Sequence, residues 1–305
     1  MVYCPLASLV VLASHCMNRI GRKSQFGSAI VSSANFLFGL RIFSFAVSAV
    51  VAVFFTFPSF WLMEKASLDE DAGTFILAAC SLVILSAGLF RVLRAQARTT
   101  RTVTQWSSEA GSMGAASIGN EPDTPALSAS KGAPALILVG IRRPRVMVSD
   151  MATSVLSRDE LQAAVRHEFG HMRTWDNLKK VLITATPFPG MGGVESAWRE
   201  AAELAADDAA VANRQDALNL AAALIKLSRS SKQWSEPALA SGFVSGSCSI
   251  RLRVERLLEW RTAGRRLQRS WPWTLLVLIP AIAGMVSNYG AMLALTHRLT
   301  ELLVP

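Results

Sequence analysis

Long runs of apolar residues lie before and after one extended polar stretch of this chain. Three runs lie near the beginning, at about 2–17, 42–63 and 74–93, and a fourth lies at 271–295. The last three are long enough to cross a bilayer, which takes about 20 apolar residues in a helix. The first is short and no basic residue precedes it, so we expect a short or tilted crossing rather than a cleaved signal peptide. The pattern predicts a mainly α membrane protein with four, or three, transmembrane helices.

The polar stretch begins with a segment of small and polar residues. Residues 99–133 are rich in Ser, Ala, Gly and Thr and hold few large apolar side chains, which predicts a flexible linker. Two β-favouring runs follow, at 135–139 and 145–149, around a turn signal at 140–144. They indicate a hairpin or an edge strand, and an edge strand at 145–149 would hold an extended substrate by adding it to the sheet.

Amphipathic spacing predicts helices in the rest of the polar stretch. The first is the best defined, because Ser157 and Glu160 form a capping box and the apolar periodicity continues over 158–185. Three more helices are expected, at 195–212, 216–227 and 250–260. We therefore expect an α+β domain over 134–262, inserted between a membrane domain at 1–98 and the last apolar run.

Composition and charge agree with a membrane location. Hydrophobic residues make up 51% of the 305 residues, and the mean hydropathy of +0.33 is high for a soluble enzyme. The net charge of +9 comes from bases beside the apolar runs, Arg41 among them, whereas the loop at 64–73 is acidic. By the positive-inside rule, the polar domain is cytoplasmic in a multi-pass inner-membrane protein. Anionic lipid headgroups account for the bases, so we expect no direct nucleic-acid binding.

The four cysteines show no C-x-x-C pair, which argues against a disulfide framework and fits a reducing cytoplasm.

The candidate chemistry lies in one pentapeptide, His167-Glu168-Phe169-Gly170-His171. Residues i and i+4 of a helix lie on one face, so both imidazoles can bind a single zinc ion. Glu168 is rotated by about 100° from His167, which keeps its carboxylate near an activated water without ligating the metal. This arrangement predicts Glu168 as the general base of a zinc metalloendopeptidase. The alternative interpretation is a solvated helix face that carries two surface histidines.

A catalytic zinc needs a third protein ligand and one open position. The second predicted helix of the polar domain offers Glu200 and Glu203. We expect Glu203, because only it has an acid four residues later, Asp207, which could accept a hydrogen bond from the outer nitrogen of a ligating histidine. The alternative is that these acids form an exposed stripe.

Several segments resemble the BlaR/MecR antirepressor family of membrane metallopeptidases. They are the sequences at 140–148, 156–161, 167–178, 198–200, 203–208 and 253–258. The resemblance implies a gluzincin-like domain in which the zinc ligands are His167, His171 and Glu203 and the base is Glu168. It also implies that Asp207 supports a ligating histidine from outside the coordination sphere and that Asp176 has an orienting role. The family's extracellular sensor domain would follow the fourth span, and the resemblance here covers the peptidase core without it.

We therefore predict a membrane-embedded zinc endopeptidase that cleaves a protein substrate at the cytoplasmic face. The resemblance implies signal transduction, with a transcriptional repressor as the substrate. One alternative is a quality-control peptidase of the HtpX/CAAX-protease kind, which shares the H-E-x-x-H and E-x-x-x-D arrangement. Another is a membrane signalling component in which the zinc is structural. A transporter is disfavoured, because the apolar runs hold almost no ionisable groups.

Overall fold

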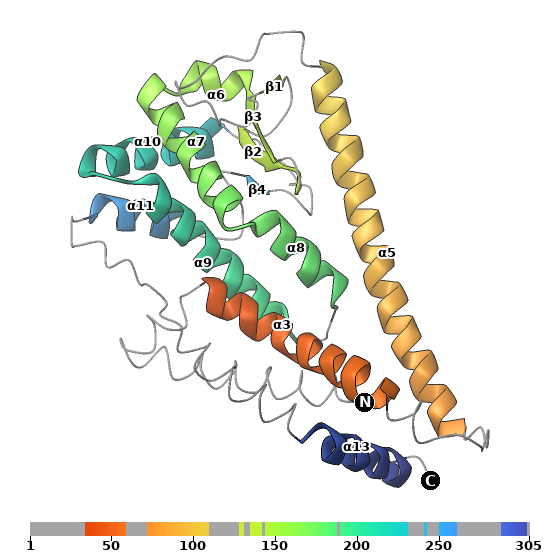
Figure 1. The fold of residues 1–305 in the computed structure, drawn as a ribbon. Helices are drawn as coiled ribbons and strands as arrows, with labels where there is room; N and C mark the ends of the chain where they lie inside the picture. The colour runs from red at the N-terminus through yellow and green to blue at the C-terminus, as the bar shows by residue number, and fades with distance from the viewer. Residues whose placement is uncertain are drawn as a thin grey trace.

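Helices account for most of the described chain, and one small sheet lies among them (Figure 1). The computed structural model describes residues 34–58, 72–109, 128–130, 135–141, 144–187, 190–230, 241–242, 250–260 and 288–303. The helices are α3 (Ala34–Val51), the π-helix η1 (Ala52–Thr56), α5 (Ala72–Glu109), α6 (Asp150–Val155), α7 (Arg158–Arg173), α8 (Asp176–Ala185), α9 (Gly192–Ala210), α10 (Arg214–Ser230), α11 (Ile250–Leu258) and α13 (Tyr289–Leu303). The strands are β1 (Ser128–Ser130), β2 (Leu136–Val139), β3 (Arg145–Ser149) and β4 (Ser241–Gly242). The apolar run predicted at 2–17 lies outside the described residues, as does most of the run at 271–295.

The strand order in the sheet is β1-β3-β2-β4. The predicted hairpin is confirmed, since β2 and β3 are antiparallel and Leu136 is paired with Val148. The edge-strand alternative for 145–149 is wrong, because β1 pairs in parallel with the far side of β3, where Ala129 lies opposite Val148. The small residues of β1 join the sheet through backbone hydrogen bonds, so the pattern of apolar side chains did not predict this strand.

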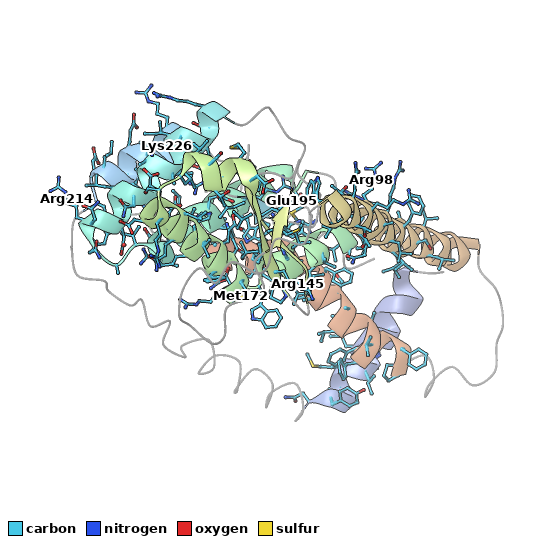
Figure 2. All side chains as sticks on the ribbon, turned by 90° about the horizontal axis from the view of Figure 1, so that it is seen from above. Arg98, Arg145, Met172, Glu195, Arg214 and Lys226 are labelled. Atoms are coloured by element: carbon cyan, nitrogen blue, oxygen red, sulfur yellow. The ribbon has the colours of Figure 1, made fainter. Side chains whose placement is uncertain are left out.

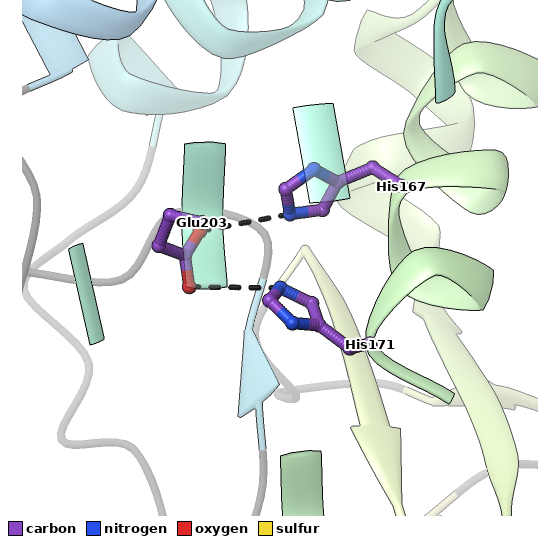
Figure 3. Close-up of side chains that lie close together, drawn as sticks. All are labelled: His167, His171 and Glu203. Carbon is purple, nitrogen blue, oxygen red and sulfur yellow. Dashed lines mark ion pairs between the residues drawn. The ribbon is translucent and has the colours of Figure 1, made fainter. Parts of the chain in front are cut away.

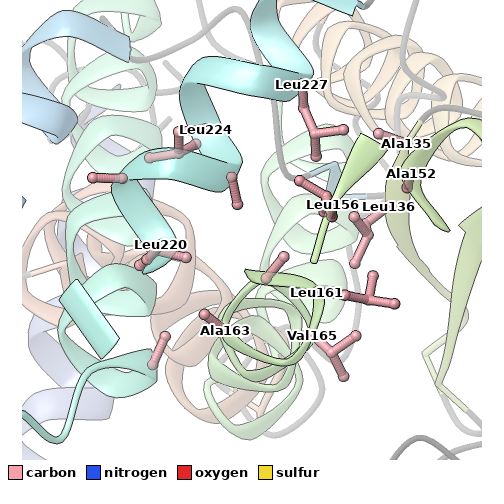
Figure 4. Close-up of a cluster of buried hydrophobic side chains, with 14 of the residues drawn as sticks. Ala135, Leu136, Ala152, Leu156, Leu161, Ala163, Val165, Leu220, Leu224 and Leu227 are labelled. Carbon is pink, nitrogen blue, oxygen red and sulfur yellow. The ribbon is translucent and has the colours of Figure 1, made fainter. Parts of the chain in front are cut away.

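Alternate residues of the sheet face two different layers, as the two-residue period of a strand requires. On one face Leu136, Leu138, Val146 and Val148 join the main core with side chains of α7 and α10, among them Ala163 and Leu220 (Figure 4). On the other face Ile137 and Met147 contact Trp106 of α5. The sheet is therefore covered by the site-bearing helices on one side and by α5 on the other.

The contact with Trp106 explains why part of the predicted linker is wrong. Residues 99–109 belong to α5, and the Thr102 and Thr104 hydroxyls donate to carbonyls one turn earlier. Burial of Trp106 against the sheet outweighs the weak helix propensity of this Ser- and Thr-rich segment. The linker prediction is also wrong for residues 128–130, because they form β1.

The capping box is present where the sequence placed it. The Ser157 hydroxyl accepts from the Glu160 backbone N–H (3.3 Å), and the Glu160 carboxylate accepts from the Ser157 N–H (2.8 Å). Lys226 of α10 donates to the same carboxylate at 2.8 Å. Helix α7 therefore begins at Arg158, as predicted.

We expect Glu160→Gln to lower the free energy of unfolding by about 0.5–1 kcal/mol at pH 7, because glutamine keeps the cap but loses the ion pair with Lys226. Burial raises the pKa of Glu160, but the hydrogen bonds from Lys226 and Ser157 outweigh it and leave the pKa below the ordinary 4.5. The stabilisation is present above pH 4.5 and is lost as the pH falls through the lower folded-state pKa. Thermal unfolding at pH 7 and at acid pH measures this, and a difference that persists in acid would contradict it.

The single helix predicted over 158–185 is wrong, because two helices meet at Trp175. Helix α7 ends at Arg173 and α8 begins at Asp176 (Figure 1). Trp175 between them has φ 57°, in the left-handed region that side chains other than glycine rarely adopt. The break turns the chain, so that Asp176 lies back against α7.

Large apolar side chains are exposed on the helices of two predicted spans. They are Phe43, Val50, Val53, Phe54 and Phe57 on the α3–η1 helix, and Leu82, Val83, Leu85, Leu89, Phe90 and Leu93 on α5. Within the described ranges, no single helix is long and apolar enough to cross a membrane, but the pair Ala34–Phe43 and Phe45–Phe55, bent by 41°, meets that test together. Helix α13 lies beside this pair (Figure 2), with the Tyr289 hydroxyl donating to the Phe54 carbonyl at 2.8 Å.

Arg41 does not lie at the edge of a span among headgroups, as the sequence suggested. Its side chain is fully buried and links α3 to the junction of α8 and α9. It donates to the Glu195 carboxylate at 2.9 Å and to the Thr186 carbonyl at 2.6 Å. One face of the first half of α3 is thus part of the protein interior, where Leu37 packs against Trp198 of α9.

Replacing Arg41 by methionine should lower the free energy of unfolding by about 3 kcal/mol, because the partly buried Glu195 carboxylate and the Thr186 carbonyl lose their donor. The matched control is Arg199→Met. Arg199 is half exposed and lies 4.0 Å from the same carboxylate, so its loss should cost less than about 1 kcal/mol. Thermal unfolding in detergent compares the two variants, and equal small shifts would show that the buried contact contributes little.

Candidate metal centre

Three side chains from two helices converge in the interior. His167 and His171 lie one turn apart on α7, and Glu203 faces them from α9 (Figure 3). The distance from His167 Nε2 to Glu203 Oε2 is 3.6 Å, and that from His171 Nε2 to Glu203 Oε1 is also 3.6 Å. Each residue offers one ligand atom, and these atoms lie within 4.8 Å of one another. The structure thus brings together the three residues that the sequence proposed as ligands.

The two 3.6 Å distances involve different oxygens of Glu203. With one ligand atom from each residue, the three atoms lie within 4.8 Å of one another, so a cation can bind after a small closing movement of the side chains. A tetrahedral ion with ligands at about 2.0–2.2 Å holds neighbouring donor atoms roughly 3.3–3.6 Å apart. A direct hydrogen bond between the same atoms would be shorter, near 2.9 Å. His167, His171 and Glu203 are all buried, so the donors are shielded from competing solvent. This His/His/Glu group can therefore hold a metal ion.

Two aspartates hold the outer nitrogens of the histidines. Asp207 Oδ1 lies 2.9 Å from His167 Nδ1, and Asp176 Oδ2 lies 2.7 Å from His171 Nδ1. Each carboxylate favours a proton on Nδ1, which leaves Nε2 as the lone-pair donor on the side of Glu203. Asp176 reaches its histidine only because the chain turns at Trp175.

The pKa values of the centre reflect this mutual contact. Burial alone would lower the pKa of His167, but the hydrogen bond to Asp207 and the nearby Glu203 carboxylate outweigh it and raise the pKa to about 9. Burial would raise the pKa of Glu203, yet the charge of His171 and contacts with His167 and Arg253 lower it to about 2. In the metal-free protein, His167 therefore keeps a proton at neutral pH, and a cation has to displace it.

Buried negative charge exceeds the permanent positive charge at this centre. The pKa values of Asp176, Glu203 and Asp207 are all lowered, so three carboxylates are ionised. Among the described residues, Arg253 and Lys179 pair with them through a fixed positive charge. A proton on an imidazole or a divalent cation supplies what is missing, because uncompensated charge is costly in the interior.

Glu168 and Glu200 have different environments. Glu168 follows His167 on α7 and its side chain is fully buried, as a residue of an enclosed site would be. Glu200, the alternative third ligand, is exposed on α9. The exposed-stripe interpretation of the α9 acids is wrong for Glu203 and Asp207, which face inward.

Arg253 was not predicted from the sequence as part of this centre. This residue of α11 is fully buried and donates to Asp207 at 2.8 and 2.7 Å and to Glu203 at 3.0 Å. One signal was present, since Arg253 lies one turn before the buried Leu257 and thus on the apolar stripe of a basic helix. An arginine in that stripe indicates an internal anionic partner.

Gly170 sets how closely α7 and α9 approach. A Cβ at this position would lie 3.0 Å from Ala206 Cα and 3.2 Å from Ala206 Cβ. On α9, Ala202 directly precedes the ligand residue Glu203, and Ala206, one turn later, directly precedes Asp207. The contact of Gly170 with Ala206 is therefore at the level of the ligands. The element that excludes bulk at Gly170 is α9, through its backbone at Ala206.

Gly170→Ala should lower metal affinity by about tenfold, although alanine is favoured in helices by about 1 kcal/mol. The added methyl group must push α9 away and separate Glu203 from the histidines. Gly192→Ala is the control, because Gly192 begins α9 and no atom lies within 4 Å of its added Cβ. Competition with a chromophoric chelator measures the metal affinities. An unchanged affinity for Gly170→Ala would show that α7 and α9 can move apart without disturbing the ligands.

A cavity of about 260 Å³ lies beside His171. Its apolar walls come from the end of β2, the following turn and the α7–α8 junction, and include Leu138, Ile141, Met172 and Trp175. The Asn177 amide shapes it by donating to the carbonyls of Leu138 (3.2 Å) and Gly140 (3.0 Å). The cavity is large enough to hold one large apolar side chain.

No protein-family model matches this sequence, and no curated protein matches it either. The functional assignment therefore depends on the motif and on the geometry of the centre.

Proposed function

We propose that this protein is a zinc-dependent endopeptidase of the BlaR/MecR type. The observation that carries the proposal is the convergence of His167, His171 and Glu203, with both histidine Nε2 atoms 3.6 Å from the Glu203 carboxylate. Two imidazoles and one carboxylate are the donor set of catalytic zinc sites that keep a position open. A bound zinc ion would supply Lewis acidity, polarising the scissile carbonyl and an attacking water.

Glu168 is the base in this proposal. It lies in the site-bearing helix directly after His167 and is buried. Its carboxylate takes the proton from the attacking water as the tetrahedral carbon forms, and it returns that proton to the leaving amine.

Asp207 and Asp176 orient the two imidazoles. By accepting from each Nδ1–H they fix the tautomer and the ring plane, and they raise the basicity of Nε2. A histidine without such a partner would be free to rotate or to present the wrong nitrogen.

We further propose that the centre belongs to an α+β domain of the gluzincin kind at the cytoplasmic face of the inner membrane. Exposed apolar side chains of α5 and of the α3–η1 helix support contact with lipid. Arginines follow the apolar part of α5, and Arg98 projects from this helix (Figure 2). The substrate is then a protein that reaches this face, and the resemblance of the motifs favours a transcriptional repressor.

The full-length chain, purified in detergent, tests this function. We expect one zinc per chain by mass spectrometry, and cleavage of an unstructured protein such as casein that stops with chelator and returns with zinc. Zinc without any chelator-sensitive cleavage would overturn the peptidase assignment in favour of a structural metal. A chain that binds no metal would overturn the metal site as well.

A further inference from the structure

Arg253 bridges two residues of the metal centre from a third helix. Its guanidinium is fully buried. Nε and Nη2 donate to the two oxygens of Asp207 at 2.8 and 2.7 Å, and Nη1 donates to Glu203 Oε2 at 3.0 Å. One rigid plane thus holds two carboxylates of α9 at fixed angles.

A charge in this position is not needed for packing. Burying a guanidinium costs several kcal/mol before its partners are counted, and an apolar side chain of similar length would fill the same space. The planar fork is specific, since lysine donates from a single point and cannot contact both carboxylates in the same way. The partners of Arg253, rather than the core, therefore explain its presence.

The contact distinguishes the two oxygens of Glu203. Oε2 accepts the Arg253 hydrogen bond and lies 3.6 Å from His167 Nε2, whereas Oε1 lies 3.6 Å from His171 Nε2. A strong charged donor on Oε2 withdraws electron density and occupies one of its lone pairs, which weakens this oxygen as a ligand. Oε1 has the advantage as the ligating atom.

We infer that Arg253 is a positioning residue that makes Glu203 a one-oxygen ligand and so keeps a coordination position open for substrate or water. The inference rests on the proposed metal site. Through Asp207, the same guanidinium also fixes His167, because Asp207 Oδ1 accepts from both residues. Helix α11 is then part of the active centre, although it supplies no ligand.

The test measures coordination of the metal directly. Full-length Arg253→Met and Arg253→Lys, loaded with zinc, are compared with wild type by X-ray absorption, and with cobalt by visible absorption. We expect both variants to gain about one oxygen ligand as Glu203 binds through both oxygens, and to lose intensity in the cobalt band. At saturating zinc, proteolysis should fall by about 10–100-fold. Arg251→Met is the matched control, since Arg251 lies exposed on the same helix and pairs only with Glu255 among the residues described.

The outcomes separate the two proposals. Unchanged metal spectra in folded, metal-loaded Arg253 variants would overturn the positioning role, even if the variants were less stable. If Arg253→Met does not fold, the spectra of Arg253→Lys test the positioning role, because lysine keeps the buried charge and loses only the planar set of donors. A wild-type chain without bound metal would instead overturn the proposed function itself.

Discussion

Glu168→Gln should lower peptide-bond hydrolysis by about 10²–10⁴-fold and leave the zinc content at the wild-type level. Glutamine has the same shape as glutamate but cannot take up a proton from the attacking water. Glu168 is also not one of the three converging ligand residues, so the metal should stay. Cleavage of casein at saturating substrate, with zinc measured on the same sample, tests both parts.

Glu200→Gln is the matched control for this experiment, because it makes the same chemical change on an exposed surface of α9. Its activity should equal that of wild type. If Glu168→Gln cleaves casein as fast as Glu200→Gln does, another group accepts the proton. A joint loss of zinc and activity would show that Glu168 supports the fold of the centre.

Glu203→Gln should weaken zinc binding by more than about 100-fold, which exceeds the usual effect of losing an orienting partner. The amide oxygen is neutral and a poorer ligand, and the change also takes from Arg253 an anionic partner at 3.0 Å. Competition with a chromophoric chelator gives the dissociation constants, again with Glu200→Gln as control. An affinity within threefold of wild type would mean that the metal, if bound, lies elsewhere.

Local rules sufficed for the helix that carries the motif. The capping box of Ser157 and Glu160 determines where α7 begins, and the i, i+4 spacing determines that His167 and His171 share a face. The expectation for Glu203 drew on a similar local rule, since an acid one turn later can support a histidine. These features depend on neighbours within a few residues, so the sequence alone could predict them.

Features that depend on distant parts of the chain escaped prediction. The left-handed position at the break is occupied by Trp175, a residue type that rarely adopts this conformation, and the conformation accompanies the contact of Asp176 with His171. Arg41 and Arg253 resemble surface charges in the sequence, yet both find buried partners more than forty residues away along the chain. Such pairs are fixed by packing, which the spacing of residues along one helix does not encode.

The contact at Gly170 also bears on how the centre responds when its ion leaves. A Cβ on Gly170 would lie 3.0 Å from Ala206 Cα, so the two helices already approach each other closely at this point. The empty cage should keep its dimensions instead of collapsing. Rebinding of an ion would then need little rearrangement of the domain.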